Sequence, residues 1–427
     1  MNVLIIGSGG REHAIALKIK QSKLLTSLYC LPGNTGTEQI AFNTNINLSC
    51  HSSVIEFCAE KKIDLIVIGP EQPLVNGLSD ELRNNGFIVF GPSAKAARIE
   101  SSKIFAKKIM IDSGVPTADF KEFTNDNSLS VFDYLNNSKF PVVIKADGLA
   151  AGKGVFICTS LIEAQKAINE IFEQKIFGDS GNKIIVEEFL EGDEASIFAI
   201  TDGENFICLP AAQDHKRIGD NDTGKNTGGM GAYAPTPLIT DQLLKIIEKE
   251  IIKPTLNQLN ITGNKFIGCL YAGLMIAKTG PKVIEFNCRF GDPETQVVLP
   301  ILEGDLLQLL HSASSGKLNK DCIKYSGGTS VCVVAASAGY PDDYKKGFEI
   351  SGLNQDEVEI IIYHAGTRKD GNKILTDGGR VLGVTSLIKE FDIEKAQRTA
   401  YNAISKIYFE GIYFRKDIGD RALKYLK

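Results

Sequence analysis

Three short apolar runs near the start of the chain limit how it can fold. The runs VLIIG, LIVIG and FIVFG end at Gly7, Gly69 and Gly91, and more polar segments separate them. Such continuous apolar runs predict strands that are buried on both faces. Helical segments expected at 11–20 and 75–84 alternate with them, which predicts a parallel sheet covered by helices. A chain of 427 residues is longer than one ordinary domain, so further domains are expected.

Three turns follow strands of this predicted sheet. The first, GSGGREH, leads into a helix, where backbone N–H groups favour an anion such as a phosphate. It is a poor dinucleotide fingerprint, because Glu12 stands in place of the third glycine and the next strand ends in LPGN without an acidic residue. Turns at Asn34 and Glu71 should reach the same carboxyl edge of the sheet, where ligands bind. A glycine turn that only packs a helix against the sheet is the alternative.

A second glycine-rich turn, KADGLAAGKG, lies between two apolar strands and predicts a hairpin. It is not a P-loop, because Gly148 and Gly152 are too close together and Gly154 stands where a Ser or Thr would hold magnesium. Backbone amides of this turn could close as a flap over ATP phosphates, with Lys145 as a fixed cation and Lys153 at the far end. A plain glycine-rich hairpin is the alternative.

An acidic pair, Glu187 and Glu188, ends the apolar strand IIVEEFL. One carboxylate or a backbone carbonyl there could accept a hydrogen bond from an adenine amine, and Glu194 could bind ribose hydroxyls. Exposed surface acids are the default interpretation of such a pair.

The segment IEFNCRFGDPETQ is the most informative. Glu285, Asn287 and Arg289 alternate along a strand and should point to one face, while the intervening apolar residues fill the core. A carboxylate beside an amide oxygen offers hard ligands for magnesium. An arginine next to them suits a carboxylate or a phosphate. This combination is typical of phosphoryl transfer.

A polar segment, QDHKR, precedes the glycine-rich TGGMG. Asp214 could take an ammonium group, and Lys216 and Arg217 could bind an anion. His215 could be taken for a general base, but an amine that attacks an acyl phosphate hardly needs one. A solvated loop is the alternative interpretation.

Charge and cysteine usage exclude several function classes. The net charge of −5 gives no sign of nucleic-acid binding. The first residues lack the features of a signal peptide, and no apolar stretch is long enough to span a bilayer. Nine scattered cysteines without a C-x-x-C pair predict reduced thiols, so we expect a cytoplasmic protein. His51 beside Cys50 has no second pair to complete a zinc site.

Together these segments closely resemble the phosphoribosylamine–glycine ligases, also called glycinamide ribonucleotide synthetases, of the ATP-grasp superfamily. The matching strings include GSGGREHA, PGNTGT, GPEQPLV, KADGLAAGKGV, QDHKR, NTGGMGAY, RFGDPETQ and FRKDIG. They cover almost the whole chain, from residue 5 to residue 419. Lys225, where many members have proline, is a minor departure.

The resemblance implies an α/β protein with the ATP-grasp fold. An N-terminal Rossmann-like parallel-sheet domain at 1–102 would hold phosphoribosylamine. The ATP-grasp part would follow at 103–325, with a small ATP lid at about 117–193 and a catalytic part at 194–325. A C-terminal α/β domain would occupy 326–427.

The resemblance also implies roles for individual residues. The residues implied for ATP are Lys103, Lys145, Gly152, Lys153, Gly154, Glu187, Glu188, Leu190 and Glu194. The residues implied for phosphoribosylamine and glycine are Gly9, Gly10, Arg11, Asn34, Glu71, Asp214, Lys216 and Arg289. Glu285 and Asn287 would bind Mg²⁺ or Mn²⁺, and Lys145, Arg289 and Asp214 would be catalytic.

The implied reaction is ATP-dependent joining of glycine to 5-phosphoribosylamine through glycyl phosphate, in purine synthesis. We expect a monomer that binds these small molecules and neither nucleic acid nor membrane. Another ATP-grasp ligase or carboxylase that uses a different acid is the main alternative. A nucleotide-binding sensor without chemistry is a second alternative, although it would more readily have lost Glu285, Asn287 or a lysine.

Overall fold

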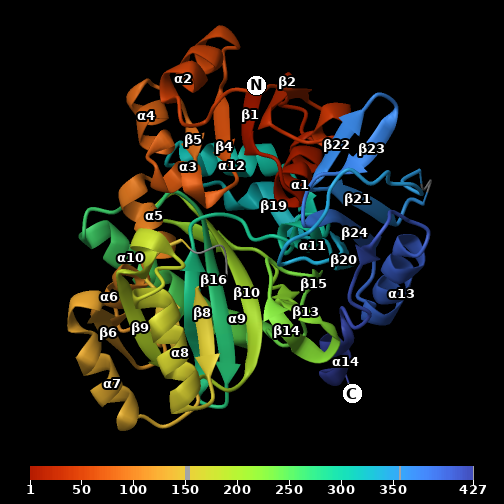
Figure 1. The fold of residues 1–427 in the computed structure, drawn as a ribbon. Helices are drawn as coiled ribbons and strands as arrows, with labels where there is room; N and C mark the ends of the chain where they lie inside the picture. The colour runs from red at the N-terminus through yellow and green to blue at the C-terminus, as the bar shows by residue number, and fades with distance from the viewer. Residues whose placement is uncertain (150–153, 355–356, 427) are drawn as a thin grey trace.

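The computed structural model describes residues 1–149, 154–354 and 357–426 (Figure 1). Within these residues the strands form four sheets of at least four strands and three two-stranded sheets. In the view of Figure 1 the red N-terminal part lies at the top, the blue C-terminal part lies on the right, and the orange and yellow segments that follow the N-terminal part lie at the lower left. None of the helices in the described part of the chain is long and apolar enough to cross a membrane.

The N-terminal sheet is parallel throughout, as the alternating apolar strands predicted. Its strands, in the order β3-β2-β1-β4-β5, are β3 (Phe42–Asn43), β2 (Ser27–Pro32), β1 (Asn2–Gly7), β4 (Leu65–Ile68) and β5 (Val89–Phe90). Helices α1 (Gly10–Ile19) and α2 (His51–Glu60) accompany it. The single helix expected at 75–84 was wrong: α3 (Glu71–Val75) and α4 (Leu78–Asn84) are separate. Gly77 lies between them with a φ of 84°, which interrupts a helix and suits glycine.

The predicted hairpin around the glycine-rich turn is confirmed, since β7 (Val142–Ala146) pairs antiparallel with β8 (Val155–Cys158). These strands belong to a four-stranded sheet with β6 (Phe120–Thr124) and β9 (Lys183–Glu188). Helices α7 (Ser128–Asn136) and α8 (Leu161–Phe172) contribute to a hydrophobic cluster with the buried side chains of this sheet. This four-stranded unit with its two helices, referred to below as the lid, therefore has a hydrophobic core of its own.

The central sheet is antiparallel and has the order β11-β10-β16-β17. Its strands are β11 (Phe206–Cys208), β10 (Asp193–Thr201), β16 (Gly268–Ala277) and β17 (Gly280–Asn287). Helices α5 (Ala94–Ser101) and α6 (Lys103–Asp112) connect the N-terminal part to this region and contact β17.

The C-terminal sheet contains strands from two distant parts of the chain. β20 (Thr329–Ser337), β24 (Arg380–Ile388), β21 (Ile360–His364) and β25 (Ile412–Tyr413) come from the C-terminal part. β12 (Gln213–Asp214) and β15 (Gly231–Ala234) join them from the middle of the chain. The QDHKR segment is thereby attached to the C-terminal sheet, which the sequence did not indicate.

Candidate active site

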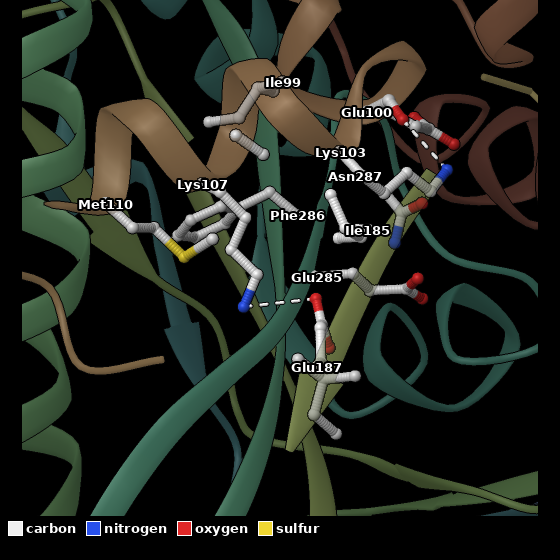
Figure 2. Close-up of a pocket in the computed structure, with 12 residues that line it drawn as sticks. Ile99, Glu100, Lys103, Lys107, Met110, Ile185, Glu187, Glu285, Phe286 and Asn287 are labelled. Atoms are coloured by element: carbon white, nitrogen blue, oxygen red, sulfur yellow. Dashed lines mark hydrogen bonds and ion pairs between the residues drawn. The ribbon is translucent and has the colours of Figure 1, made fainter. Parts of the chain in front are cut away.

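Successive side chains at the end of β17 point alternately to the core and to a pocket, as the sequence predicted. Phe286 and Cys288 are only 2% and 1% exposed, whereas Glu285 and Asn287 are half-buried. The latter two line a pocket together with Lys103. In Figure 2 the side chains of Lys103, Asn287 and Glu285 extend to the same side of this pocket. β17 therefore turns its apolar side chains to the core and its oxygen ligands outward.

The carboxylate of Glu285 and the amide of Asn287 make no hydrogen bond or ion pair with other residues of the described part. Burial would raise the pKa of Glu285, but Lys216, Lys145, Lys103 and Arg289 together lower it below its usual value. The carboxylate is therefore ionised and free to bind a cation.

These two side chains fit a magnesium ion that is shared with a nucleotide. Among the described residues there is no group of three or more His, Cys, Asp or Glu side chains that could enclose a metal on its own. Magnesium commonly takes one or two protein oxygens and completes its shell with water and phosphate oxygens. Glu285 and Asn287 supply hard oxygens of this kind.

Lys145 takes part in a buried ion cluster on the lid side of the pocket. Its Nζ atom lies 2.8 Å from Oε2 of Glu187 and donates to the carbonyl of Ile284 at 3.1 Å. The other carboxylate oxygen of Glu187 lies 3.1 Å from Nζ of Lys107 (Figure 2). Lys107 was not among the expected site residues, although its position one helical turn after Lys103 could have suggested it.

Lys103 ties the pocket to the start of the glycine-rich turn. Its Nζ atom donates to the carbonyl of Gly148 at 3.0 Å and to that of Glu100 at 3.4 Å. Asp147 accepts hydrogen bonds from Oγ of Ser102 at 3.0 Å and from the amide of Ile104 at 3.1 Å. The base of the flap is thus bonded to the N-terminus of α6.

The rest of the expected flap is described only in part. Gly152 and Lys153 lie outside the described residues. Gly154 immediately precedes β8, and its carbonyl accepts a hydrogen bond from the amide of Ala146 at 3.0 Å.

The other residues expected at the nucleotide flank the link between β9 and β10. Oε1 of Glu188 accepts from Nζ of Lys282 at 2.9 Å, which contributes to a pKa below the usual value for Glu188. Leu190 is half-buried just after β9. Glu194, near the start of β10, pairs with Lys216 at 2.7 Å.

Asp214 and Lys216 bring a second charged group of residues to the site. Asp214 is 6% exposed, and burial raises its pKa to about 7, helped by the Glu294 and Glu194 carboxylates and opposed by Lys216. The buried Glu294 accepts a hydrogen bond from Oη of Tyr271 at 2.9 Å. Glu294 belongs to the RFGDPETQ string, but the sequence did not single it out.

Arg289 follows β17 and bridges two acidic side chains. Its Nη2 atom donates to Oε1 of Glu100 at 2.9 Å, and its Nε atom lies 3.3 Å from Oε2 of Glu71. The second oxygen of Glu100 accepts from the amide of Cys288 at 2.8 Å. Glu100 was not predicted, because its partners are distant in the sequence.

A carboxylate of helix α1 bonds the backbone of the first glycine turn. The carboxylate of Glu12 accepts from the amide of Gly9 at 2.6 Å and from Nε of Arg11 at 2.7 Å. Arg11 is only 8% exposed and also donates to the carbonyl of Phe290 at 3.0 Å. The Glu12 carboxylate therefore takes the amide of Gly9 and the guanidinium of Arg11, while helix α1 begins at Gly10.

Asn34 connects this turn to the C-terminal part of the molecule. Its Nδ2 atom donates at 2.8 Å to the carbonyl of Ser8 and, also at 2.8 Å, to that of His364. The amide of His364 donates to Nδ1 of His13 at 2.9 Å. His364 is a neighbour of the expected phosphate site that was not predicted.

Comparison with known proteins supports these observations over nearly the whole chain. Residues 1–100, 101–295 and 330–421 match the N domain, the ATP-grasp (A) domain and the C domain of phosphoribosylglycinamide synthetase. The chain is 49% identical to phosphoribosylamine–glycine ligase of Caldanaerobacter subterraneus subsp. tengcongensis, covering 98% of this chain and 99% of that protein. It is 46% identical to the Chlorobaculum tepidum protein of the same name, covering 99% and 100%.

A solved structure agrees with the fold. The crystal structure of phosphoribosylamine–glycine ligase from Thermotoga maritima is similar with a TM-score of 0.85 and 34% identity, covering 98% of this chain and 100% of that one. The expected ATP-grasp fold, with a parallel N-terminal sheet and mixed α/β architecture, is confirmed. The chain belongs to the phosphoribosylglycinamide synthetase family.

Proposed function

We propose that this chain is an ATP-dependent ligase that joins glycine to 5-phosphoribosylamine and forms glycinamide ribonucleotide, ADP and phosphate in purine synthesis. The family match and the relatives of nearly equal length support this activity. The single structural observation that carries it is the pocket at β17, where Glu285 and Asn287 face Lys103 and the Lys145–Glu187 pair.

The first step activates a carboxylate. A free carboxylate does not acylate an amine at neutral pH, because oxide is a poor leaving group. An oxygen of the glycine carboxylate attacks the γ-phosphorus of ATP, the bond to the β–γ bridging oxygen breaks, and ADP leaves. Lys103 and Lys145 neutralise charge on the phosphates as the phosphoryl group moves.

Glu285 and Asn287 would hold Mg²⁺ or Mn²⁺ beside these phosphates. The ion, when bound, would screen their negative charge and orient the γ-phosphoryl group.

The second step forms the amide bond. The amine of phosphoribosylamine attacks the acyl carbon, inorganic phosphate leaves, and the nitrogen loses a proton. The flap that begins at Gly148 would exclude water, since the acyl phosphate would otherwise hydrolyse.

Asp214 and Arg289 are suited to hold glycine, because one offers a carboxylate for an ammonium group and the other a guanidinium for a carboxylate. Lys216 adds a positive charge beside Asp214. The turn of Gly9, Gly10 and Arg11, with Asn34 and Glu71 at the same sheet edge, would bind the phosphate and ribose of phosphoribosylamine.

Further residues would complete the nucleotide site. Gly152, Lys153 and Gly154 would contact ATP phosphates, and Glu187, Glu188, Leu190 and Glu194 would surround adenine and ribose. The chain would divide at 1–102, 103–325 and 326–427, and would act as a cytoplasmic monomer.

ADP release measured with ATP, glycine and freshly made phosphoribosylamine tests this function, with each substrate omitted in turn. We expect release to require both co-substrates. Other carboxylic acids and bicarbonate should be tried in place of glycine. Faster release with one of these acids would identify a different ATP-grasp ligase or carboxylase.

A further inference from the structure

The strand that carries Asp214 is hydrogen-bonded to a residue near the C-terminus. Asp214 and Lys216 lie near Glu194 and Glu294 on the pocket side. The backbone carbonyl of Asp214 accepts a hydrogen bond from Nη1 of Arg421 at 3.3 Å. Arg421 belongs to the short helix α14 (Asp420–Lys424), far from β12 in the sequence.

Arg421 is part of an ion cluster with Arg415, Asp222 and Asp417. Nη2 of Arg421 donates to one oxygen of Asp222, and Nη1 of Arg415 donates to the other at 3.0 Å. The side chain of Arg415 is 0% exposed and pairs with both oxygens of Asp417, at 2.7 and 2.6 Å. It also donates to the carbonyl of Arg217 at 3.0 Å.

Lys416 and Asp417 also bond to a turn in which two residues other than glycine have positive φ angles. The hairpin after QDHKR consists of β13 (Arg217–Gly219) and β14 (Thr223–Asn226). Between these strands, Asn221 and Asp222 have positive φ angles of 53° and 56°. The amide of Asn221 donates to Asp417 at 2.9 Å, and Asp220 accepts from the amide of Lys416 at 2.8 Å. Such backbone conformations persist where the surroundings determine them.

The buried side chains of Gln213, on β12, and of His215, just after it, do not replace these contacts. His215 is 0% exposed, and neither ring nitrogen has a hydrogen-bond partner among the described residues. Burial, with Arg421 and Arg415 nearby, lowers the pKa of His215 to about 3, so the ring is neutral. Nε2 of Gln213 likewise has no partner in the described part of the chain.

We propose that Arg421 and Arg415 are positioning residues that hold the Asp214–Lys216 segment in the geometry required to bind the amino-acid substrate. An ion cluster around a buried arginine is a weak source of stability, but removal of one member leaves its partners without a counter-charge, so the segments that carry these charges can be displaced. Displacement of a substrate-binding group by about 1 Å can cost up to a hundredfold in rate. The inference rests on the proposed function, in which Asp214 binds glycine.

The test compares Arg421→Ala and Arg421→Lys with wild type, and uses Arg398→Ala as a control because Arg398 is exposed on α13 (Ile393–Ile404). We expect Arg421→Ala to raise the KM for glycine between about tenfold and a hundredfold. The KM for ATP should change less than about threefold, and Arg421→Lys should restore part of the loss. An unchanged KM for glycine, or equal losses for all substrates, would overturn the proposal.

Hydrogen exchange separates this inference from the proposed function. In Arg421→Ala we expect faster amide exchange in 213–226 and unchanged exchange in β7. Faster exchange in 213–226 would support the positional role of Arg421. Absence of glycine-dependent ADP release in wild type would refute the proposed function but would leave this positional role standing. Unchanged exchange in 213–226 would refute the positional role, whatever the substrate.

Discussion

Glu285 has no protein partner among the described residues, and nearby cations hold its pKa below the usual value. Because we propose that it binds a metal and it makes no contact that supports the fold, we expect Glu285→Ala to lower kcat by about a hundredfold or more while the protein stays folded. ADP release and circular dichroism measure the two effects. Glu410→Ala, at an exposed position, is the control. Turnover close to wild type in Glu285→Ala would remove this residue from the mechanism.

Asp214 should make activity depend on pH. Burial raises its pKa to about 7, with Glu294 and Glu194 acting in the same direction and Lys216 and Arg421 against it. Below this pH the group gains a proton and loses the charge that, in the proposed function, binds the ammonium group of glycine. We therefore expect kcat/KM for glycine to fall about tenfold per pH unit on the acid side. We expect the Asp214→Asn variant to have low activity and to lack this acid-side fall in kcat/KM. A pH profile identical to that of wild type would exclude Asp214 as the source of the fall.

The Lys107 side chain should contribute to the free energy of unfolding. It is 2% exposed, pairs with Glu187, and donates to Oγ1 of Thr117 at 2.8 Å. Lys107→Met leaves these groups with fewer partners, so we expect the free energy of unfolding to fall by about 3 kcal/mol in urea titrations. Lys108→Met on the same helix changes an exposed side chain and should stay within about 0.5 kcal/mol. Equal effects in the two variants would contradict this role.

Residue patterns along one strand could be read from the sequence, whereas long-range charge partners could not. The alternation of Glu285, Phe286 and Asn287 follows from strand geometry, so it was predictable. Glu100 accepts from Cys288, which is 188 residues away, and no local pattern indicates such a contact. Glu294 was missed for the same physical reason, whereas the position of Lys107 one helical turn after Lys103 was a local signal that was not used.

At the scale of elements, helix α6 and the lid hairpin act together through Asp147. Its carboxylate accepts from Ser102 and from the amide of Ile104 at the start of α6. We expect Asp147→Ala to raise the KM for ATP roughly tenfold, with little change in that for glycine, because the base of the flap loses its anchor. Asp133→Ala, exposed on α7, is the control. A selective effect on glycine would contradict this view.

Most elements were predictable, but their exact breaks were not. The antiparallel pairing of β7 and β8 follows from the glycine-rich turn between two apolar strands. The break at Gly77 depends on one left-handed residue inside an otherwise helical pattern. β12 is only two residues long, so its pairing with β15 is set by tertiary contacts and not by local preference.

At the scale of the whole molecule, the site collects residues from distant parts of the chain. Glu71 and Glu100 come from the N-terminal side, Arg289 follows the central sheet, and Arg421 reaches β12 from the C-terminal end. The C-terminal sheet includes β12 and β15, so the C-terminal part is built into the proposed glycine site. This arrangement would bring the substrates together where the parts of the chain meet.

The central claim is that Glu285 and Asn287 hold a divalent ion beside the nucleotide. Electron paramagnetic resonance of Mn²⁺, titrated with protein and a non-hydrolysable ATP analogue, tests it directly. We expect wild type and Glu410→Ala to deplete the signal of unbound Mn²⁺ beyond what the analogue alone achieves, and Glu285→Ala with Asn287→Ala to lose this extra depletion. Equal depletion by the double variant and wild type would contradict the claim.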